Sequence, residues 1–429
     1  MLEKLFMRIA FISYEYPPDT ADGGIATYIY QASRMLANRG HTVEVFCGSR
    51  ERTETSQEGE ILVHRLKAVH DKGFSAGTGF SPEIAEVFAK RHALAPFDVL
   101  EGPEWRADAH HAVRLVPDIP LVLKLHTPTY LLMRISRPPF GSRVHLSQTK
   151  NTILTTLRGG QRFGQVEQAL ERLHSKDADE IAAPSNAIAA ELVRAWQIDP
   201  ALVSHVPLPY TPGPDLLTIP ADTDTGRVTF LGRLEMRKGV IDLAQAIPLV
   251  LRRHPSAKFR FVGRARASPR YDMNMREYLE RKLSSCLDSV EFRDPVPLAA
   301  VPQVLSETDI CVFPSVWESY GFVCLEAMAA ARGVIGSSAG GMAELLGGGE
   351  VGLLVPPHCP NKIADAICAL LSDPARRKTL GQTARERTLR EYNPDRIGAL
   401  QEQSYLRAIE RRRRLGPRPS ASAKAARQP

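Results

Sequence analysis

The sequence predicts an α/β protein made of two doubly wound domains, and three observations support this. The chain has 429 residues, which is too long for one ordinary hydrophobic core. Short runs rich in Val, Ile and Leu alternate with amphipathic stretches of helical length, as in parallel sheets covered by helices on both faces. The proline-rich segment VPLPYTPGPDLLTIPADTDTG interrupts this rhythm once, and the rhythm then restarts. We therefore expect domains over residues 1–210 and 211–395.

The expected strands of the first half are RIAFISY, TVEVFCG, ILVHRL, FDVLEG and LVLKLHT. Between them we expect helices at IATYIYQASRMLANRG, at PEIAEVFAKRHAL and from about Trp105. Ligands of doubly wound sheets bind beyond the carboxyl ends of the strands. The loops that directly follow these strands are therefore the first places to search for functional side chains.

The second half repeats the alternation with VTFLGRL, FRFVG, VEFRD, DICVFPS, GVIGSS and GLLVPP as strands, each followed by a helical stretch. A last helix over about residues 396–414 is expected to pack back toward the first domain. The tail over residues 415–429 is rich in Pro, Ala and Ser, so we expect it to be disordered.

Charge and cysteine content limit the class of protein. The net charge is +7, and the chain after Glu410 carries seven basic residues and no acidic one, so residues 411–429 account for the whole excess. The six cysteines show no CxxC spacing, which favours a reducing cytoplasmic setting without disulfides or a zinc site. No apolar run reaches the roughly 20 residues that span a bilayer, and no signal-peptide cleavage site is visible. Two D-x-D spacings, at 177–179 and 222–224, are expected to be structural.

Two loops carry residue types suited to a phosphate ligand. In YEYPPDTADGGIATY, Gly23 and Gly24 precede a helix, whose N-terminus attracts anions. In FLGRLEMRKG, Arg233 and Lys238 together suit a diphosphate. A plain turn and a solvated surface pair remain the respective alternatives. The fingerprint GxGxxG is missing from both of these loops, which weighs against a dehydrogenase.

The stretch ESYGFVCLEAM places Glu318 before a helix and Glu326 about two turns inside it. A glutamate among Val, Leu, Ala and Met side chains requires a partner, and hydroxyl groups of a ligand would supply one. Alternatively, Glu318 complements the helix dipole and Glu326 pairs with an arginine.

Together, the Gly-Gly loop, the R-x4-K spacing and the E-x7-E spacing followed by AMA resemble the family-4 glycosyltransferases of the GT-B fold. The resemblance extends to about residue 410 and includes ADEIAAPSNAIAAEL and AGGMAELLGGGEVGLLVPP. It implies two Rossmann-like domains facing across a cleft. It also implies a hexosyltransferase-type reaction that uses a nucleotide-diphosphate sugar, retains the anomeric configuration and needs no metal or other cofactor. The usual Asn-Gly turn after the interdomain strand is replaced here by VPLPYTPGPD, which leaves the contacts of that turn open.

In the second domain the resemblance assigns Arg233 and Lys238 to the leaving diphosphate and Glu318 to the donor sugar. Glu326 is assigned to the ribose hydroxyls. Gly321, Phe322 and Val323 fall at the start of the same helix and are included in the expected donor site.

In the first domain the resemblance places the backbone of Gly23 and Gly24 near the phosphates and His126 of LKLHTPT near the sugar. Three further residues, Glu104, Trp105 and Arg106, follow a strand in EGPEWRADAH, and we expect them to touch the acceptor.

The resemblance does not explain one charged segment. Residues 119–166 contain seven Lys or Arg residues and no Asp or Glu. It is either a solvated basic face or a surface for anionic lipid or a lipid-linked acceptor, the latter giving a peripheral membrane enzyme at the inner surface. The expected partners are a nucleotide-sugar donor and a glycan or lipid-linked acceptor, with no nucleic acid. Two alternatives remain open: another GT-B enzyme such as a sugar-nucleotide epimerase or phosphorylase, and a non-enzymatic protein that binds through its basic surface.

Overall fold

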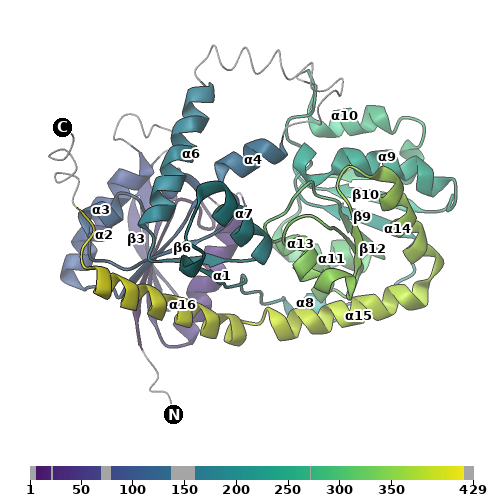
Figure 1. Cartoon of the computed structure of the whole chain (residues 1–429). Coiled ribbons are helices and arrows are strands. Elements are labelled where there is room, and N and C mark those ends of the chain that lie inside the picture. The colour runs from purple at the N-terminus through teal and green to yellow at the C-terminus, as the bar shows by residue number, and fades with distance from the viewer. Residues whose placement is uncertain (1–5, 21–22, 69–78, 137–159, 271, 420–429) are drawn as a thin grey trace. The chain divides into compact units, whose positions relative to one another are not determined.

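The computed structural model describes residues 6–20, 23–68, 79–136, 160–270 and 272–419, with the backbone alone for 160–164. Within these residues the chain forms two compact units (Figure 1). The N-terminal unit runs to Leu131, resumes over Gly160–Pro209 and takes up the chain again from Asn393. The C-terminal unit comprises Tyr210–Tyr392 and the described residues that follow Leu131.

In the described part of the N-terminal unit, one sheet has the strand order β3-β4-β2-β1-β5-β6-β7-β8. Its neighbouring strands are parallel except for the antiparallel pair β3 and β4. The strands are β1 Arg8–Ser13, β2 Thr42–Ser49, β3 Glu54–Glu58, β4 Ile61–Lys67, β5 Val99–Pro103, β6 Leu121–Lys124, β7 Glu180–Ala183 and β8 Val203–His205. The chain order reverses between β1 and β5, so this is the point where a doubly wound sheet binds its ligand.

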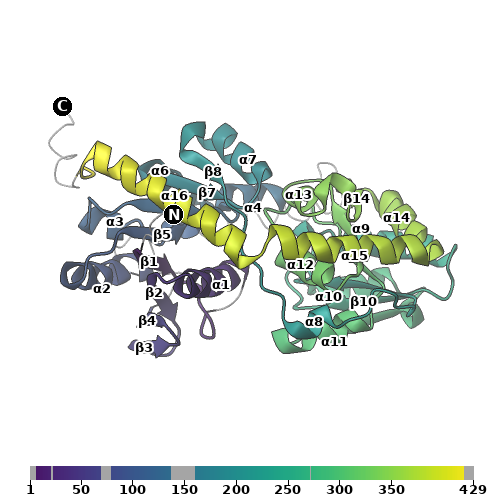
Figure 2. The same ribbon diagram turned by 90° about the horizontal axis from the view of Figure 1, so that it is seen from below.

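Helices pack on this sheet, and the last helix of the chain is among them. They are α1 Gly24–Asn38, α2 Phe80–Leu94, α3 Ala112–Leu115, α6 Gly160–Asp177, α7 Asn186–Trp196 and α16 Pro394–Leu415. Helix α4, Thr129–Ile135, begins in this unit and ends among the residues grouped with the C-terminal unit. Helix α16 lies beside α1 (Figure 2), where Arg39 Nε contacts Glu402 Oε1 at 2.7 Å. The helix expected from Trp105 is instead a 3-10 turn, η2 (Trp105–Ala107), followed by the short α3, because Arg106 and Ala107 have positive φ.

The C-terminal unit holds a fully parallel sheet with the order β11-β10-β9-β12-β13-β14 in the residues described. Its strands are β9 Arg227–Leu231, β10 Lys258–Val262, β11 Val290–Arg293, β12 Ile310–Phe313, β13 Gly333–Ser337 and β14 Leu353–Val355. Numbered from β9, this is the dinucleotide-fold order 3-2-1-4-5-6, with its switch point between β9 and β12. The two doubly wound α/β units confirm the predicted fold class.

The helices of this unit are α8 Pro214–Leu217, α9 Val240–Leu251, α10 Met275–Lys282, α11 Val301–Ser306, α12 Phe322–Ala329, α13 Met342–Leu345, α14 Pro360–Ser372 and α15 Pro374–Glu391. The second half of the proline-rich connector is held to this unit by three arginines. Arg332 donates to the Thr223 hydroxyl and Arg377 to the Thr223 carbonyl, while Arg385 donates to the carbonyl of Ile219. The connector is therefore fixed to the C-terminal unit from about Ile219 onward.

The structure corrects the expected disorder of the tail at its first residues. Arg418 is 5% exposed, and its guanidinium lies 2.5 Å from Asp179, which also pairs with Arg412 at 2.6 Å. Asp179 is fully buried, and a buried carboxylate requires charged or hydrogen-bonding partners. Its D-x-D motif thus has a structural role, as predicted. Residues 420–429 lie outside the described part of the chain.

The basic segment 119–166 is described only in part, since residues 137–159 lie outside the described residues. One of its charges differs from the expectation of a solvated face, because Lys124 is completely buried. The hypothesis of contact with anionic lipid stays a prediction for the remainder.

Candidate functional site

In the C-terminal unit, three loops at the carboxyl edge of the sheet approach one another closely. Gly239 has a φ of +70°, and a Cβ there would lie 1.9 Å from the main-chain oxygen of Pro314. Gly340 has a φ of +80°, and its Cβ would lie 2.2 Å from the main-chain oxygen of Glu318. Only glycine fits both the backbone conformation and the space. The loops after β9, β12 and β13 are thereby held together at the switch point.

This close approach joins two of the predicted residues. Lys238 Nζ donates a short hydrogen bond to Glu318 Oε2, which also accepts from the Ser315 hydroxyl at 3.3 Å. The side chains of Lys238 and Glu318 are 16% and 12% exposed, so the pair is mostly shielded but still reaches the surface. Residues that are 80 positions apart in the sequence therefore form one ion pair at the predicted edge of the sheet.

Arg233 lies in the same loop as Lys238, but its partner is Glu235. Its Nε is 3.3 Å from Glu235 Oε1, an atom that also lies 2.7 Å from Arg237. The Arg233 side chain is 39% exposed. Neither Glu235 nor Arg237 was among the predicted site residues, although both stand in FLGRLEMRKG between the two that were.

The charges in this loop affect one another. Burial lowers the pKa of Lys238, and the charge of Glu318 opposes that shift. For Glu318, burial favours the neutral acid, but the nearby cations Lys238 and Arg237 outweigh it and lower the pKa. Burial and the charge of Arg237 also lower the pKa of Arg233. Each member of the ion pair therefore favours the charged form of the other, next to an arginine that experiences repulsion from its own neighbours.

Glu326 is the fifth of the eight residues of α12, and its carboxylate has no hydrogen-bond or ion-pair partner in the part of the chain that is described. Burial raises its pKa to about 7. Its charge in turn contributes to a raised pKa of Tyr210, for which burial is the larger cause. The arginine partner considered as an alternative for Glu326 is thus not observed among the described residues, which leaves the carboxylate available to ligand hydroxyls.

The N-terminus of α12 adds main-chain donors beside these carboxylates. Gly321 precedes the helix with a φ of +124°, and no side chain caps the helix there. The first helical N–H groups, those of Phe322 and Val323, precede the first intrahelical bond, which Cys324 N donates to the Gly321 carbonyl. The three predicted residues therefore form the start of a helix with donors available to a ligand.

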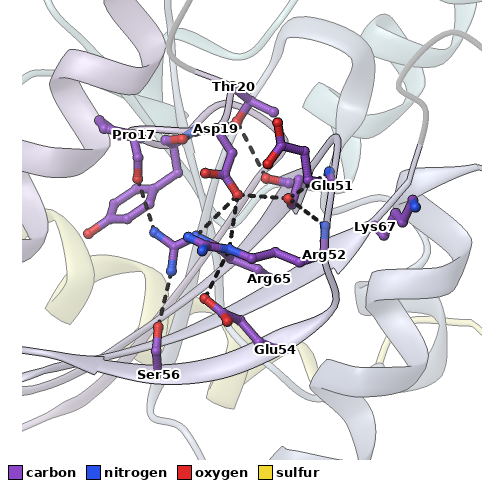
Figure 3. Close-up of polar contacts among 12 residues, drawn as sticks. Pro17, Asp19, Thr20, Glu51, Arg52, Glu54, Ser56, Arg65 and Lys67 are labelled. Carbon is purple, nitrogen blue, oxygen red and sulfur yellow. Dashed lines mark hydrogen bonds and ion pairs between the residues drawn. The ribbon is translucent and has the colours of Figure 1, made fainter.

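In the N-terminal unit, the loop after β1 is firmly held before it reaches Gly23. Arg65 on β4 donates to the Pro17 carbonyl at 3.1 Å and to the Ser56 hydroxyl at 3.2 Å, and it lies 3.7 Å from Asp19 (Figure 3). Asp19 accepts from the Ser49 hydroxyl at 2.7 Å. A buried guanidinium with several partners fixes geometry well, so Pro17 and Asp19 in this loop have a defined position.

Gly23 and Gly24 stand at the start of α1, as predicted, Gly23 preceding the helix and Gly24 opening it. Gly23 has extended backbone, with a φ of −163°, which any residue can adopt. A Cβ there would lie 3.4 Å from Glu15 Oε2, an ordinary contact. Local structure does not explain a glycine at this position, whereas close approach of a ligand to the backbone would.

His126 follows β6, and its side chain has an unpartnered donor–acceptor atom. Nε2 is buried without a hydrogen-bond partner in the described residues. Burial and the charge of Lys124 lower the pKa of His126 to about 3, so the imidazole is neutral at neutral pH. Its ring packs edge-on against Tyr28, with centroids 5.6 Å apart. The imidazole is therefore held in place with one nitrogen unused.

Glu104 lies beneath His126 rather than at the surface. It is fully buried, and both carboxylate oxygens accept from the His126 main-chain N–H at 2.9 and 2.8 Å. Burial and the charge of Glu171 raise the pKa of Glu104 to about 8. This placement indicates that Glu104 positions the backbone of His126. It does not fit the contact with the acceptor that was expected for Glu104.

Glu171 on α6 was not predicted, and it organises the same loop. It accepts from the main chain of Arg106 at 3.0 Å and from the Thr129 hydroxyl at 2.6 Å. Burial raises the pKa of Glu171 to about 7. The Arg106 guanidinium lies 4.9 Å from the Trp105 ring. The signal for Glu171 was an acid on the apolar side of an amphipathic helix, which is visible in the sequence but not specific.

Three findings concern other expected features. No group of three or more His, Cys, Asp or Glu residues within the described ranges could hold a metal ion. The six cysteines are unpaired. A search of the described helices found none that is both long and apolar enough to cross a membrane.

Comparison with known families and proteins agrees with this arrangement. Residues 22–211 match the family described as Glycosyltransferase Family 4, and residues 225–373 match Glycosyl transferases group 1. The D-inositol 3-phosphate glycosyltransferase of Kineococcus radiotolerans is 28% identical, over 89% of this chain and 91% of the relative. The glycogen synthase of Mycobacterium tuberculosis is 25% identical, over 96% and 97%.

Solved structures show the same fold. Sucrose-phosphate synthase from Thermosynechococcus elongatus has a TM-score of 0.73 at 23% identity, covering 94% of this chain and 99% of that one. Anabaena HepE in complex with UDP-glucose has a TM-score of 0.63 at 15% identity, covering 93% and 99%. The two family matches lie on either side of the unit boundary and together cover most of the chain. The chain therefore belongs to the family-4, group 1 glycosyltransferases and is a transferase of the GT-B fold.

Proposed function

We propose that this glycosyltransferase moves a sugar from a nucleotide-diphosphate sugar to a hydroxyl group of a glycan or lipid-linked acceptor, with retention of the anomeric configuration. The observation that carries the proposal is the pairing of Lys238 with Glu318 at the switch point of the C-terminal sheet, with Arg233 in the same loop. Ligands of such sheets bind at this edge.

The reaction explains why these residue types are needed. Cleavage of a glycosyl–phosphate bond places negative charge on the departing diphosphate and positive charge on the anomeric carbon. Fixed cations directed at the departing group stabilise the transition state more than the ground state. Lys238 is held in place by Glu318 before substrate binds, so its ammonium group requires no reorganisation during the reaction. Arg233 adds a planar fork of donors that suits phosphate oxygens.

The remaining donor contacts follow from groups that lack protein partners. Glu326 carries a carboxylate able to accept from two neighbouring ribose hydroxyls, and the N–H groups at the start of α12 suit phosphate or sugar oxygens. Among the structural neighbours, HepE was solved with UDP-glucose and a starch synthase with ADP. These ligands support a nucleotide donor for this chain.

In the N-terminal unit we propose that His126 contacts the donor sugar through its free Nε2, and that the backbone at Gly23 and Gly24 approaches the phosphates. Trp105 and Arg106 are assigned to the acceptor. No protein nucleophile is assigned, and the acceptor attacks from the face that the diphosphate leaves. In this scheme the cations Arg233 and Lys238 take the part that a metal ion plays elsewhere, so turnover is expected to persist in EDTA.

The experiment is a screen of UDP-, GDP- and ADP-sugars for donor hydrolysis and transfer, with the anomeric configuration of the product read by NMR. One donor is expected to be consumed, giving a nucleoside diphosphate and a product of unchanged configuration. Conversion of the donor into an epimeric nucleotide sugar would favour an epimerase instead. Absence of both binding and hydrolysis for all three donor classes would refute the proposal.

A further inference from the structure

The sheet of the C-terminal unit continues past β9 and β10 as a short pair of extended segments. Leu234 and Ala265 form a parallel bridge, in which Leu234 N donates to the Arg264 carbonyl at 2.9 Å and Arg266 N donates to the Leu234 carbonyl at 3.0 Å. Side chains alternate between the two faces of extended chain. Leu234 is buried in the core, so the residues that flank the bridge lie on the opposite face.

This opposite face carries an excess of positive charge. Arg233 and Glu235 flank the bridge on one segment, and Arg264 and Arg266 flank it on the other. Arg237 follows closely and shares Glu235 with Arg233. The charge of Arg266, like that of Arg237, acts on Arg233 and opposes its protonation. These two segments and the residues just after them thus carry four arginines and a single glutamate, and two of the arginines contact that glutamate.

Arg266 differs from its neighbours because the protein does not balance its charge. Its side chain is exposed and makes no hydrogen bond or ion pair with any residue in the described ranges. Four positions later, Arg270 pairs with Asp272 at 2.8 Å, and Arg276 pairs with Glu280 at 2.8 Å. An unpaired guanidinium close to another cation is unfavourable by itself, so an anionic ligand would account for its placement.

The cations assigned so far are insufficient for a diphosphate. Arg233, Arg237 and Lys238 face two carboxylates, Glu235 and Glu318, which leaves one net positive charge. A departing nucleoside diphosphate carries more than one negative charge at neutral pH. We propose that Arg266, from the loop after β10, is a further ligand of the donor diphosphate and completes the cationic site formed by Arg233 and Lys238. This inference depends on the function proposed above and adds a residue that the motifs did not indicate.

The test is calorimetric binding of UDP, GDP and ADP, and of the matching nucleosides, to the full chain. Arg266→Ala is expected to weaken binding of the preferred nucleoside diphosphate about 10-fold or more, since hydrogen bonds to charged groups are strong. Binding of the unphosphorylated nucleoside should not change. Arg270→Ala is the matched control, an exposed arginine on the same loop whose charge is already paired, and should bind within about twofold of the original protein.

Charge reversal and salt sharpen the result. Arg266→Glu should weaken the diphosphate further than Arg266→Ala, and the salt dependence of binding should be shallower in both variants. If the unmodified protein binds none of the three nucleoside diphosphates, the proposed function fails and this inference with it. If it binds one and Arg266→Ala binds equally well, or loses nucleoside and nucleoside diphosphate alike, Arg266 does not bind the diphosphate and the proposed function still stands.

Discussion

Each unit contains a lysine and a glutamate that influence each other's charge, but only in the C-terminal unit do the two side chains bond directly. In the N-terminal unit, Glu101 and Lys124 are both fully buried. Glu101 accepts from the hydroxyls of Tyr28 and Tyr405 and from the Gln401 amide, while Lys124 Nζ donates to the Val206 carbonyl. Both carboxylate oxygens and the lysine nitrogen therefore have partners within the protein, and α16 contributes two of these side chains.

In the C-terminal unit, the side-chain partners of Glu318 among the residues described are Lys238 and Ser315, and the pair reaches the surface. Nearby Glu326 and Arg266 have no side-chain partner among the described residues. Buried polar groups whose hydrogen-bond partners all come from the protein stabilise a fold. Polar groups at a sheet edge that lack such partners indicate a ligand. Residue type alone would not separate the two pairs, but the number of their partners does.

The largest effect on stability is expected from removing Lys124, the buried lysine near Glu101. Lys124→Met should lower the free energy of unfolding of the N-terminal unit by about 3–5 kcal/mol, because the buried Val206 carbonyl would lose its donor and Glu101 would lose the nearby lysine. Urea unfolding followed by tryptophan fluorescence measures this. Loss of less than about 1 kcal/mol would show that Tyr28, Tyr405 and Gln401 suffice for Glu101 without Lys124.

Replacing the lysine of the Lys238–Glu318 pair with methionine should lower the turnover rate and leave stability nearly unchanged. Lys238→Met is expected to reduce the transfer rate by about 10²–10³-fold, the usual effect of removing one group that stabilises a developing charge. Its melting temperature should stay near that of the original protein, because Glu318 keeps Ser315 and contact with water. Lys258→Met, an exposed lysine on β10 that donates to the Asp288 carbonyl, is the control and should keep full activity. An unchanged rate in Lys238→Met would remove this residue from the catalytic site.

Glu326 differs from Glu101 because its carboxylate has no protein partner among the described residues, and it should therefore make the free energy of unfolding depend on pH. Burial raises the pKa of Glu326 to about 7 from 4.5, so between these values the folded state holds a proton that the unfolded state has lost. Stability therefore falls as pH rises from about 4.5 to 7 and stays lower above that, by at most about 3 kcal/mol. Glu326→Gln lacks this penalty, so unfolding experiments should show it gaining stability relative to the original protein between pH 5 and pH 8. A difference that is equal at both pH values would contradict the origin of the shift in burial.

Donor binding by the same residue should follow the opposite trend. A carboxylate accepts hydrogen bonds from ribose hydroxyls best when it is ionised, so affinity for the nucleoside diphosphate should rise from pH 6 to pH 8. In Glu326→Gln the affinity should be lower and should lose this rise. Calorimetry at three pH values measures both.

The sequence predicted most strands because their apolar runs are continuous, and it predicted Arg233, Lys238, Glu318 and Glu326 from spacing. It did not indicate β3, whose residues ETSQE are all polar and form an edge strand paired only with β4. The helix expected from Trp105 also failed, since propensity does not reveal a backbone with positive φ.

Other features depend on sheet order, which spacing along the chain does not reveal. Lys238 meets Glu318 because β9 lies next to β12, and Arg266 joins Arg233 because β10 lies on the other side of β9. The buried pair left a visible signal, a charged residue inside each of the apolar runs FDVLEG and LVLKLHT, but its partners on α16 come from about 300 residues away. These contacts form between residues that are far apart in the sequence, so only the tertiary structure reveals them.

The smallest expected effect concerns residues near the end of the described chain, where a buried charge again has all its partners within the protein. Asp179 accepts from Arg418, from Arg412 and from the main chain of Leu121 at 2.9 Å. Arg418→Ala should lower the stability of the N-terminal unit by about 1–2 kcal/mol, because Arg412 still neutralises Asp179 while the carbonyls that Arg418 reaches lose a donor. Arg414→Ala removes an equal charge from an exposed pair with Glu410 and should change stability by less than about 0.5 kcal/mol. Equal effects of the two substitutions would mean that Arg418 is held no more firmly than a solvated surface charge, and that a tail composition typical of disorder had described it correctly.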